Sequence, residues 1–397
     1  MKKRQRDSIQ CEIYYNPDKS WLKQAWCDLE QRSKPSFFLS WLWIGTWLDC
    51  FVGEFSVIEA RQNSKTVGLG ILVKQPTHLF FIPFKGKYYL HRTGNPVHDQ
   101  IWIEYNDFLM DAGEEDLIRV AMVECLVYGV NKPDAIVIGA SDEKKFGYIE
   151  HLGLKKRTVW ETKNYALNLD DLREKNQSVL QFLSRNSRYQ ILRSMRKYSD
   201  LGEITLEKAS SAEKAKEMLK IAKPLHLARW SAEHVKSGFS NEDFVAFHEL
   251  LIERGIETGA VEVYHIKAGT ETLSIMYNFK HDNHVYFYLC AINYQRTSSQ
   301  YKPGLVSHYL LINKALEEGV ASYDFMGGTA RYKETFSNTK GKLSVNQYEH
   351  SSSLLMMEDV FRSAKLWVMN KKKSVLRGVS QAGDSYGEWV RKSTSRS

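Results

Sequence analysis

The stretch DFMGGTARYKETF, residues 324–336, places a carboxylate, two adjacent glycines, a phenol and an amine close together in the chain. The apolar residues before the glycines are typical of a buried strand, and the residues after them predict the start of a helix. At the end of such a strand, Asp324 could orient or deprotonate an amine, or it could cap the next turn. Lys333 could bind a phosphate or a substrate carboxylate, or it could be a solvated surface lysine.

A second stretch, YFYLCAINYQRTSSQYKPGL, residues 286–305, predicts a buried strand, a polar loop and a helix that begins at Pro303. Proline is favoured in the first helical turn because its missing N–H would have no partner there. The remaining free N–H groups can bind a phosphate, and Gly304 lets the backbone approach that anion. The alternative is an ordinary turn between a strand and a capped helix. Two such strand ends, here and at Asp324, together predict the floor of a ligand cleft.

The segment HLARW, residues 226–230, adds a histidine, an arginine and a tryptophan. His226 and Arg229 are three residues apart, so they share one face of a predicted helix. His226 could act as a general base, although a lone histidine is more often packed with its nitrogens satisfied. Arg229 could bind an acidic group of an acceptor. Trp230 is either a wall of the acceptor pocket or part of the core.

The charge of the chain is 55 − 47 = +8, with a pI near 9.0, and this basic balance favours anionic partners. Part of the excess lies in SRNSRYQILRSMRKY, residues 184–198, and in MNKKKSVLR, residues 369–377. The first segment could face a polyanion, but the solvated side of a bridging helix is the preferred interpretation. The second could touch an anionic membrane surface, and a surface helix is again the simpler interpretation.

The cysteines are odd in number and lack CxxC spacing, and no His/Cys/Asp cluster has ligand spacing. We therefore expect neither a disulfide framework nor a metal site. No apolar run reaches the roughly 18 residues of a membrane span. No apolar segment follows the basic N-terminus, so a cytoplasmic location is expected.

The order of predicted elements positions these residues in the second of two α/β (α+β) units. A buried, Trp-rich helix is predicted near residues 21–49, and helix, strands, helix and strands then recur twice along the chain. The predicted organisation is an N-terminal unit (1–168), a basic connecting helix (169–205), a second unit that holds the site (206–350) and a basic amphipathic tail (351–397).

Several motifs together resemble the GNAT superfamily, and in particular the CelD-like branch of acetyltransferases, which is often associated with exopolysaccharide gene sets. The similar segments are HLARW, YKPGLVSHYLL, YDFMGGTARYKETF, LSRNSRYQILRSMRKY and EYNDFL. The resemblance covers about residues 30–350. FemAB-like ligases, which are related, also carry two GNAT-type domains, so the resemblance implies two tandem GNAT-like domains, each with a twisted mixed sheet flanked by helices.

The resemblance implies an acetyl-CoA or longer acyl-CoA co-substrate, no metal, and a pyrophosphate bound at the loop before the Pro303 helix. The residues implied for that contact are Ser299, Gln300, Lys302, Pro303 and Gly304. One departure is that Pro303 stands where the superfamily's phosphate loop has its first glycine, and the second small residue is missing. The first half has no comparable loop, so no acyl-CoA site is expected there.

The function implied is an acyl-CoA-dependent N-acyltransferase that acts on an amino sugar or similar amine in exopolysaccharide or envelope synthesis. Tyr332 is then either the candidate acid for the departing thiolate or a tyrosine packed at the start of its helix. Asp324 and His226 are the other catalytic candidates. Tyr105 and Asp107, with Arg229, Trp230 and Lys333, are candidates for binding the acceptor. The alternatives are an aminoacyl-tRNA-dependent FemAB-like ligase, with tRNA as partner, and a non-catalytic GNAT-fold binding protein.

Overall fold

The computed structural model describes residues 9–76, 78–79, 82–83, 86–129, 132–232, 237–296, 298–350, 360 and 363. The basic segment at residues 369–377, expected as a possible membrane contact, lies outside the described residues. None of the described helices is long and apolar enough to cross a membrane.

The first half of the chain forms seven helical segments and nine strands in the described residues. In chain order they are β1 (Ile9–Tyr15), α2 (Lys19–Glu30), η1 (Phe37–Leu39), α3 (Trp41–Phe51), β2 (Ser56–Gln62), β3 (Lys65–Gln75), β4 (His78–Leu79), β5 (Ile82–Pro83), β6 (Lys87–Leu90), η2 (His98–Ile101), β7 (Leu109–Met110), α4 (Glu115–Tyr128), β8 (Ala135–Asp142), α5 (Glu143–Phe146), η3 (Gly147–Leu152) and β9 (Lys155–Asn168).

The second half repeats this order of helices and strands. It comprises α6 (Leu169–Glu174), α7 (Val179–Phe182), α8 (Arg185–Ser199), β10 (Ile204–Lys208), α9 (Ala212–Ala232), η4 (Gly238–Ser240), α10 (Glu242–Gly255), β11 (Val261–Ala268), β12 (Glu271–His281), β13 (His284–Ile292), α11 (Pro303–Glu317), β14 (Ser322–Gly327), α12 (Arg331–Thr335) and β15 (Thr339–Glu349).

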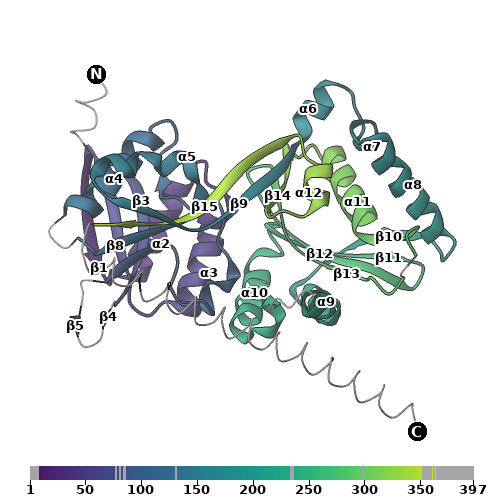
Figure 1. Ribbon diagram of the computed structural model, residues 1–397, viewed down its shortest axis with the longest axis horizontal. Helices are drawn as coiled ribbons and strands as arrows, with labels where there is room; N and C mark the ends of the chain where they lie inside the picture. Colours follow the sequence, from purple (N-terminus) through teal and green to yellow (C-terminus); the bar gives the residue numbers. More distant parts are fainter. Residues whose placement is uncertain are drawn as a thin grey trace, which may run out of the picture.

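A single mixed sheet runs through both halves, which confirms the predicted α/β class. Its strand order is β1-β2-β3-β6-β8-β15-β9-β14-β13-β12-β11-β10, with β7 beside β3. Two neighbouring pairs, β6/β8 and β13/β14, are parallel, and the other pairs are antiparallel. Strand β15, from the C-terminal end of the second half, pairs with β8 and β9 of the first. β9 and β15 form a long ribbon between the halves (Figure 1).

The connection between the halves differs from the predicted bridging helix. The segment expected as one helix is three short helices, and α8 packs on α11 within the second half. The apolar stripe of α8 explains this position, since Ile191 and Tyr198 are buried in the core beneath α11. The halves are therefore joined by the β9–β15 ribbon and by a shared core rather than by α8.

The Trp-rich segment also differs from the single helix predicted for it. Its helix α2 ends at Glu30, and a short loop that contains Pro35 precedes η1 and α3. Proline lacks the N–H that a continuing helix would need, so the chain turns here. The aromatic residues after the turn enter a core shared with the second half, where Phe37 stacks on Phe279 at 4.2 Å and Trp43 meets Phe247 at 4.9 Å. The loop at residues 33–36 is thereby held over the site described next.

Candidate active site

The strands β13 and β14 separate at the point where the candidate residues gather. Their parallel pairing covers only three positions and ends at Tyr286 opposite Asp324. Beyond it, Tyr288 is an extra residue in β13, because Phe287 and Leu289 pair with consecutive residues of β12. Such a bulge bends a strand and re-aims its backbone. The carboxyl ends of the two strands therefore diverge and leave a slot that starts at Asp324.

The two faces of the sheet differ at this slot. On one face, Phe287 and Phe325 contact His308 of α11, with ring centroids 4.7 and 5.6 Å apart. Side chains alternate along a strand, so the neighbouring Tyr286 and Asp324 point to the opposite face. Phe287 and Phe325 thus face α11, whereas Tyr286 and Asp324 face the loop at residues 33–36.

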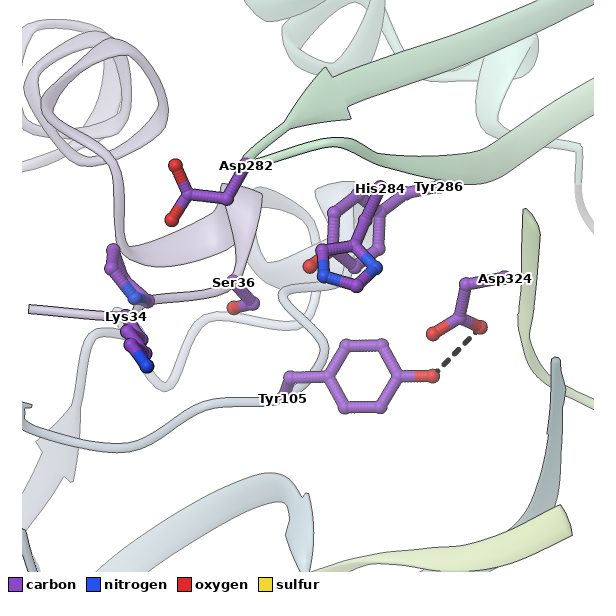
Figure 2. A pocket seen from close by; sticks show the side chains of 8 residues that line it. Lys34, Ser36, Tyr105, Asp282, His284, Tyr286 and Asp324 are labelled. Atoms are coloured by element: carbon purple, nitrogen blue, oxygen red, sulfur yellow. Dashed lines mark hydrogen bonds between the residues drawn. The ribbon is translucent and has the colours of Figure 1, made fainter. Parts of the chain in front are cut away.

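A pocket of 470 Å³ lies on the Asp324 side, between the two halves of the chain. Figure 2 shows Asp324, His284 and Tyr286 on its strand side, with Lys34 and Ser36 across from them. Its lining residues are Lys34, Pro35, Ser36, Tyr105, Asp282, His284, Tyr286 and Asp324. The oxygen Ser36 Oγ is buried without a hydrogen-bond partner. The pocket is therefore polar, and both halves build it.

Asp324 has the environment of a general base. Its Oδ1 accepts hydrogen bonds from the Tyr105 hydroxyl at 2.9 Å and from the backbone N–H of Met326 at 2.6 Å. Burial raises the pKa of the Asp324 carboxyl to about 6, against the opposing effect of these two hydrogen bonds. Both bonds end on Oδ1, which leaves Oδ2 to the pocket. A carboxyl with this pKa is ionised at neutral pH and can still accept a proton effectively.

Behind Asp324 lies a buried group of charges that includes Glu104, a residue for which no role was predicted. Glu104 accepts the Gly327 N–H at 2.7 Å and the Trp102 indole N–H at 3.1 Å. Burial raises the pKa of Glu104 to about 7. The Lys333 ammonium donates to the Gly327 carbonyl oxygen, and burial lowers the pKa of Lys333. Lys333 is thus buried rather than solvated, and its positive charge lowers the pKa values of Glu104 and Asp324 against the effect of burial.

The same contacts explain the two glycines of the DFMGG stretch. A Cβ on Gly327 would lie 3.0 Å from Glu104 Oε1, and a Cβ on Gly328 would lie 3.0 Å from Lys333 Nζ. Gly328 also has a φ of +137°, which other residues rarely adopt. Both glycines therefore admit the Glu104 carboxylate and the Lys333 amine beside the backbone.

Backbone strain is concentrated in the same place. Trp102, Tyr105 and Met326 are not glycines, yet their φ values are +56°, +52° and +61°. Strained backbone of this kind persists where surrounding contacts enforce it, and it is common at functional sites. Here it turns Glu104 and Tyr105 toward the strand ends of the other half.

Tyr332 lies on the α11 side of the slot, where the resemblance to GNAT enzymes led us to expect an acid. Its ring stacks on His308 at 4.5 Å and meets the edges of Phe287 and Phe325. Burial raises the pKa of the Tyr332 phenol well above its usual value, so the phenol keeps its proton. No described residue forms a hydrogen bond with the hydroxyl, which leaves it available to a ligand in the slot.

The loop before α11 takes the form predicted for an anion site. Pro303 is the first residue of α11, and no side chain caps the helix at Lys302. The backbone N–H of Lys302 donates to Ser194 Oγ of α8 at 2.8 Å. A Cβ added to Gly304 would meet nothing closer than Ile292 at 3.9 Å. The protein's own packing therefore does not require glycine at position 304. The space beside Gly304 could instead accommodate a ligand. Ser299 and Gln300 lie in the same loop.

The first half contains a matching pair of parallel strands, but its slot is filled. The pairing of β6 with β8 ends at Tyr89 opposite Val137. Beyond that point, Asn106 Nδ2 donates to the carbonyl oxygens of Leu90 at 2.8 Å and Gly139 at 3.0 Å. The chain's own residues thus occupy the space between these strands, and the same segment carries Glu104 and Tyr105 into the second half's site.

The HLARW residues lie on α9, away from the pocket lining. His226 Nε2 accepts the Trp230 indole N–H at 2.8 Å, so its Nδ1–H donates to Ser237 Oγ at 2.8 Å. Burial lowers the pKa of His226 to about 4. Both ring nitrogens are engaged, so the geometry supports packing for His226 and Trp230 rather than proton transfer. The exposed Arg229 guanidinium sits 5.3 Å from the Tyr294 ring centroid.

Asp107 is likewise engaged by the protein itself. Its carboxylate accepts two hydrogen bonds from the buried Arg119 guanidinium, each 2.9 Å long, and forms an ion pair with Lys145 at 3.0 Å. These bonds give Asp107 a structural role, and it also lines a second pocket, beside Tyr105 and the 33–36 loop. Its neighbour Tyr105 does line the pocket, as predicted.

Sequence reasoning missed Glu104, the 33–36 loop and the residues Asp282, His284 and Tyr286. Glu104 stood inside the EYNDFL motif, and a charged residue directly between the apolar Ile103 and the aromatic Tyr105 was the available signal. Pro35, in the stretch SKPS at residues 33–36, was the signal for the loop. Asp282 lies in the turn before β13, and His284 and Tyr286 lie near its start; none of the three gave a local sign.

Comparisons with known proteins agree with this geometry. Residues 185–334 match the model of the acetyltransferase (GNAT) domain. The search of curated protein sequences found no match.

Solved structures resemble the chain over most of its length. FemX aligns with a TM-score of 0.57 and 12% identity, over 87% of this chain and 99% of FemX. A conserved protein of unknown function from Bacteroides thetaiotaomicron aligns at 0.52 and 10%, over 85% and 99%. The C-terminal domain of a putative lysylphosphatidylglycerol synthetase from Agrobacterium fabrum aligns at 0.51 and 9%, over 86% and 96%. At such identities the likeness shows the fold. Residues 185–334 therefore match a GNAT acetyltransferase domain model, in a chain whose mixed α/β fold resembles that of FemX.

Proposed function

We propose that this protein is an acyl-CoA-dependent N-acyltransferase whose acceptor is the amine of an amino sugar or a similar polar molecule. The observation that carries the proposal is that the β13/β14 pairing ends at Asp324, with a different feature on each face of the sheet. On one face lie the loop and helix start at Lys302–Gly304, suited to a phosphorylated donor. On the other lies the 470 Å³ pocket at Asp324, whose lining residues are mostly polar and suit a polar acceptor.

The donor fits the α11 side for two reasons. The first turn of α11 offers free N–H groups without a side-chain cap, and such a helix start attracts pyrophosphate. Past Tyr286, β13 has no β14 partner, so its backbone can pair with an extended amide chain and bond the thioester oxygen. The residues that would hold the donor are Ser299, Gln300, Lys302, Pro303 and Gly304.

The chemistry follows from the two sides of the slot. The acceptor nitrogen attacks the thioester carbon, and the new C–N bond forms as the C–S bond breaks. Asp324 accepts the proton that the nitrogen loses, and Tyr332 donates a proton to the departing thiolate. An amine with a pKa near 8 is already about a tenth neutral at pH 7, so a base with a pKa of about 6 suffices.

A second candidate is an aminoacyl-tRNA-dependent ligase of the FemAB-like kind. The observation that favours it is the basic helix α8, which lies beside the proposed donor loop. The setting in exopolysaccharide or envelope synthesis is supported by the motif resemblance alone.

Calorimetric titration with acetyl-CoA tests the donor. We expect binding by the wild type and loss of binding in Gly304→Glu, because the added carboxylate would repel the pyrophosphate. Gly53→Glu is the matched control, since Gly53 is exposed and a Cβ there meets nothing within 4 Å. A wild type that binds acetyl-CoA would then be screened with amino-sugar acceptors. Failure to bind acetyl-CoA would overturn the proposal, and binding of aminoacyl-tRNA instead would establish the second candidate.

A further inference from the structure

The basic helix α8 has an unusual charge environment for a surface helix of this protein. Its four arginines, Arg185, Arg188, Arg193 and Arg196, form no ion pair with any described carboxylate. Many other basic side chains of the second half are paired, including Lys197 on the same helix, which bonds Asp200 at 3.2 Å. Unpaired positive charge gathered on one element attracts an anionic ligand.

One side of α8 lies directly against the proposed donor loop. Ser194 Oγ accepts the Lys302 N–H at 2.8 Å, and the next residue, Arg193, donates from Nη2 to the Ser299 carbonyl oxygen at 3.0 Å. Arg193 Nε is buried and has no hydrogen-bond partner. The Lys302 ammonium forms no ion pair with a described residue. Arg193 and Lys302 are therefore two basic residues beside the start of α11 whose charges no described carboxylate balances.

An exposed aromatic ring completes this flank. Tyr189 is 55% exposed, and the Arg193 guanidinium lies 5.3 Å from its ring centroid. Residues 189 and 193 are one helical turn apart, so both face the same side of α8. A free aromatic face beside a guanidinium and an ammonium combines the groups that stack a nucleobase and bind its phosphates.

We propose that this flank, Tyr189, Arg193 and Lys302, binds the 3′-phosphorylated adenosine end of the acyl-CoA donor. The assignment rests on the function proposed above, because it extends the same donor site from the start of α11 onto α8. The adenine would stack on Tyr189, and Arg193 and Lys302 would hold the phosphates. The flank would favour a thioester linked to a nucleotide, such as acyl-CoA, over a thioester without one. The proton transfer itself would still occur at Asp324. The solvated bridge preferred from the sequence is thereby replaced by a ligand-binding helix.

The experiment measures binding of acetyl-CoA and of adenosine 3′,5′-bisphosphate, which represents the nucleotide end alone. We expect the wild type to bind both and Arg193→Gln to weaken both by about tenfold, the effect of losing one charge-assisted contact. Tyr189→Leu keeps an apolar side chain on the helix surface and should also weaken both, through lost stacking.

Lys220→Gln is the matched control. Lys220 is exposed on α9, whose buried residues belong to the core on the other face of the sheet from the buried residues of α8. The substitution removes one positive charge away from Tyr189, Arg193 and Lys302 and should leave both affinities unchanged.

The outcomes separate this inference from the proposed function. A wild type that binds neither ligand overturns the acyl-CoA donor itself. Wild-type binding that Arg193→Gln leaves intact, or that Lys220→Gln weakens equally, overturns the α8 assignment alone. If Arg193→Gln still bound acetyl-CoA but no longer bound RNA, α8 would instead be an RNA-binding helix.

Discussion

At the scale of single residues, the site works by burying charges whose partners come from the other half of the chain. Asp324 receives its hydrogen bond from Tyr105, 219 positions earlier, and Glu104 binds the backbone at Gly327. Burial alone would push both carboxyls toward the neutral form, and the Lys333 ammonium opposes that effect. The result is a carboxylate with a pKa of about 6 at the floor of the acceptor pocket.

Replacement of Asp324 by Asn should abolish most of the transferase activity. Loss of a general base typically costs about 10²–10⁴-fold in rate, so we expect kcat to fall by at least about a hundredfold. The base works ionised, so wild-type kcat should rise with pH through about pH 6 and then level off. Steady-state kinetics over pH 5–8.5 measure both effects. A variant that keeps the acidic limb of the profile would show that another group is the base.

The substitution Tyr105→Phe should shift the pH profile of kcat rather than abolish activity. The Tyr105 hydrogen bond favours the ionised form of Asp324, so its removal should raise the pKa of Asp324 and move the acidic limb to higher pH. The plateau at high pH should survive, because Asp324 is ionised there in both proteins. An unchanged profile would contradict the role given to this bond.

Glu104 should make stability depend on pH. Its pKa is raised from 4.5 to about 7 in the folded state, so the folded protein holds this proton more tightly than the unfolded chain. The free energy of unfolding therefore falls as pH rises from about 4.5 to 7, by up to about 3 kcal/mol for this group. Asp324 acts in the same direction at lower pH. Glu104→Gln should flatten the slope, whereas Glu174→Gln, on the surface, should not. Urea denaturation at pH 5, 6, 7 and 8 measures the slopes, and equal slopes for wild type and Glu104→Gln would refute the assignment.

At the scale of elements, the sequence predicted the helices and strands whose boundaries depend on nearby residues. The start of α11 at Pro303, the strand that carries Asp324 and the helix after the glycines all followed from apolar spacing and from proline and glycine positions. The partners of β9 and β15 did not, because their pairing joins segments more than 170 residues apart. Neither strand's sequence specifies its neighbour. The role of Glu104 was missed for the same reason, since its environment is built by residues of the other half.

Two glycines of the site should respond to alanine in opposite ways. Gly304 lies in the first turn of α11 with open space around it, so Gly304→Ala should leave stability unchanged or raise it by about 0.5–1 kcal/mol. It should nevertheless weaken acetyl-CoA binding, because the methyl group enters the space proposed for the donor. Gly327→Ala should cost about 1–3 kcal/mol, since its Cβ would lie 2.9 Å from Thr162 Cγ2. Thermal unfolding and calorimetric titration of both variants test this contrast, and a large stability loss in Gly304→Ala would contradict it.

At the scale of the whole molecule, the two halves have similar plans and different tasks. In the second half, the pairing of the parallel strands ends at Asp324, which lines a pocket. In the first half, Asn106 fills the corresponding slot, and the filling segment delivers Glu104 and Tyr105 across the boundary. The first half thus supplies one wall of the pocket at Asp324, through Tyr105 and the 33–36 loop. This division also explains why the pocket needs both halves in fixed relation.

The strand pairing and core that the two halves share predict that neither half folds alone. The predicted first unit, residues 1–168, lacks β15, which lies between its strands β8 and β9, and the shared core joins Trp43 to Phe247 and Phe37 to Phe279. Without these contacts, β8 and β9 would have unpaired edges, and the side chains of Trp43 and Phe37 would be exposed to water. We expect the full chain to unfold in one cooperative transition, with equal calorimetric and van't Hoff enthalpies. Fragments 1–168 and 169–350 expressed singly should show no cooperative transition, and co-expression should recover a complex that binds acetyl-CoA. A cooperative transition in the isolated 1–168 fragment would show that the first half is an independent domain and that β15 merely adds to it.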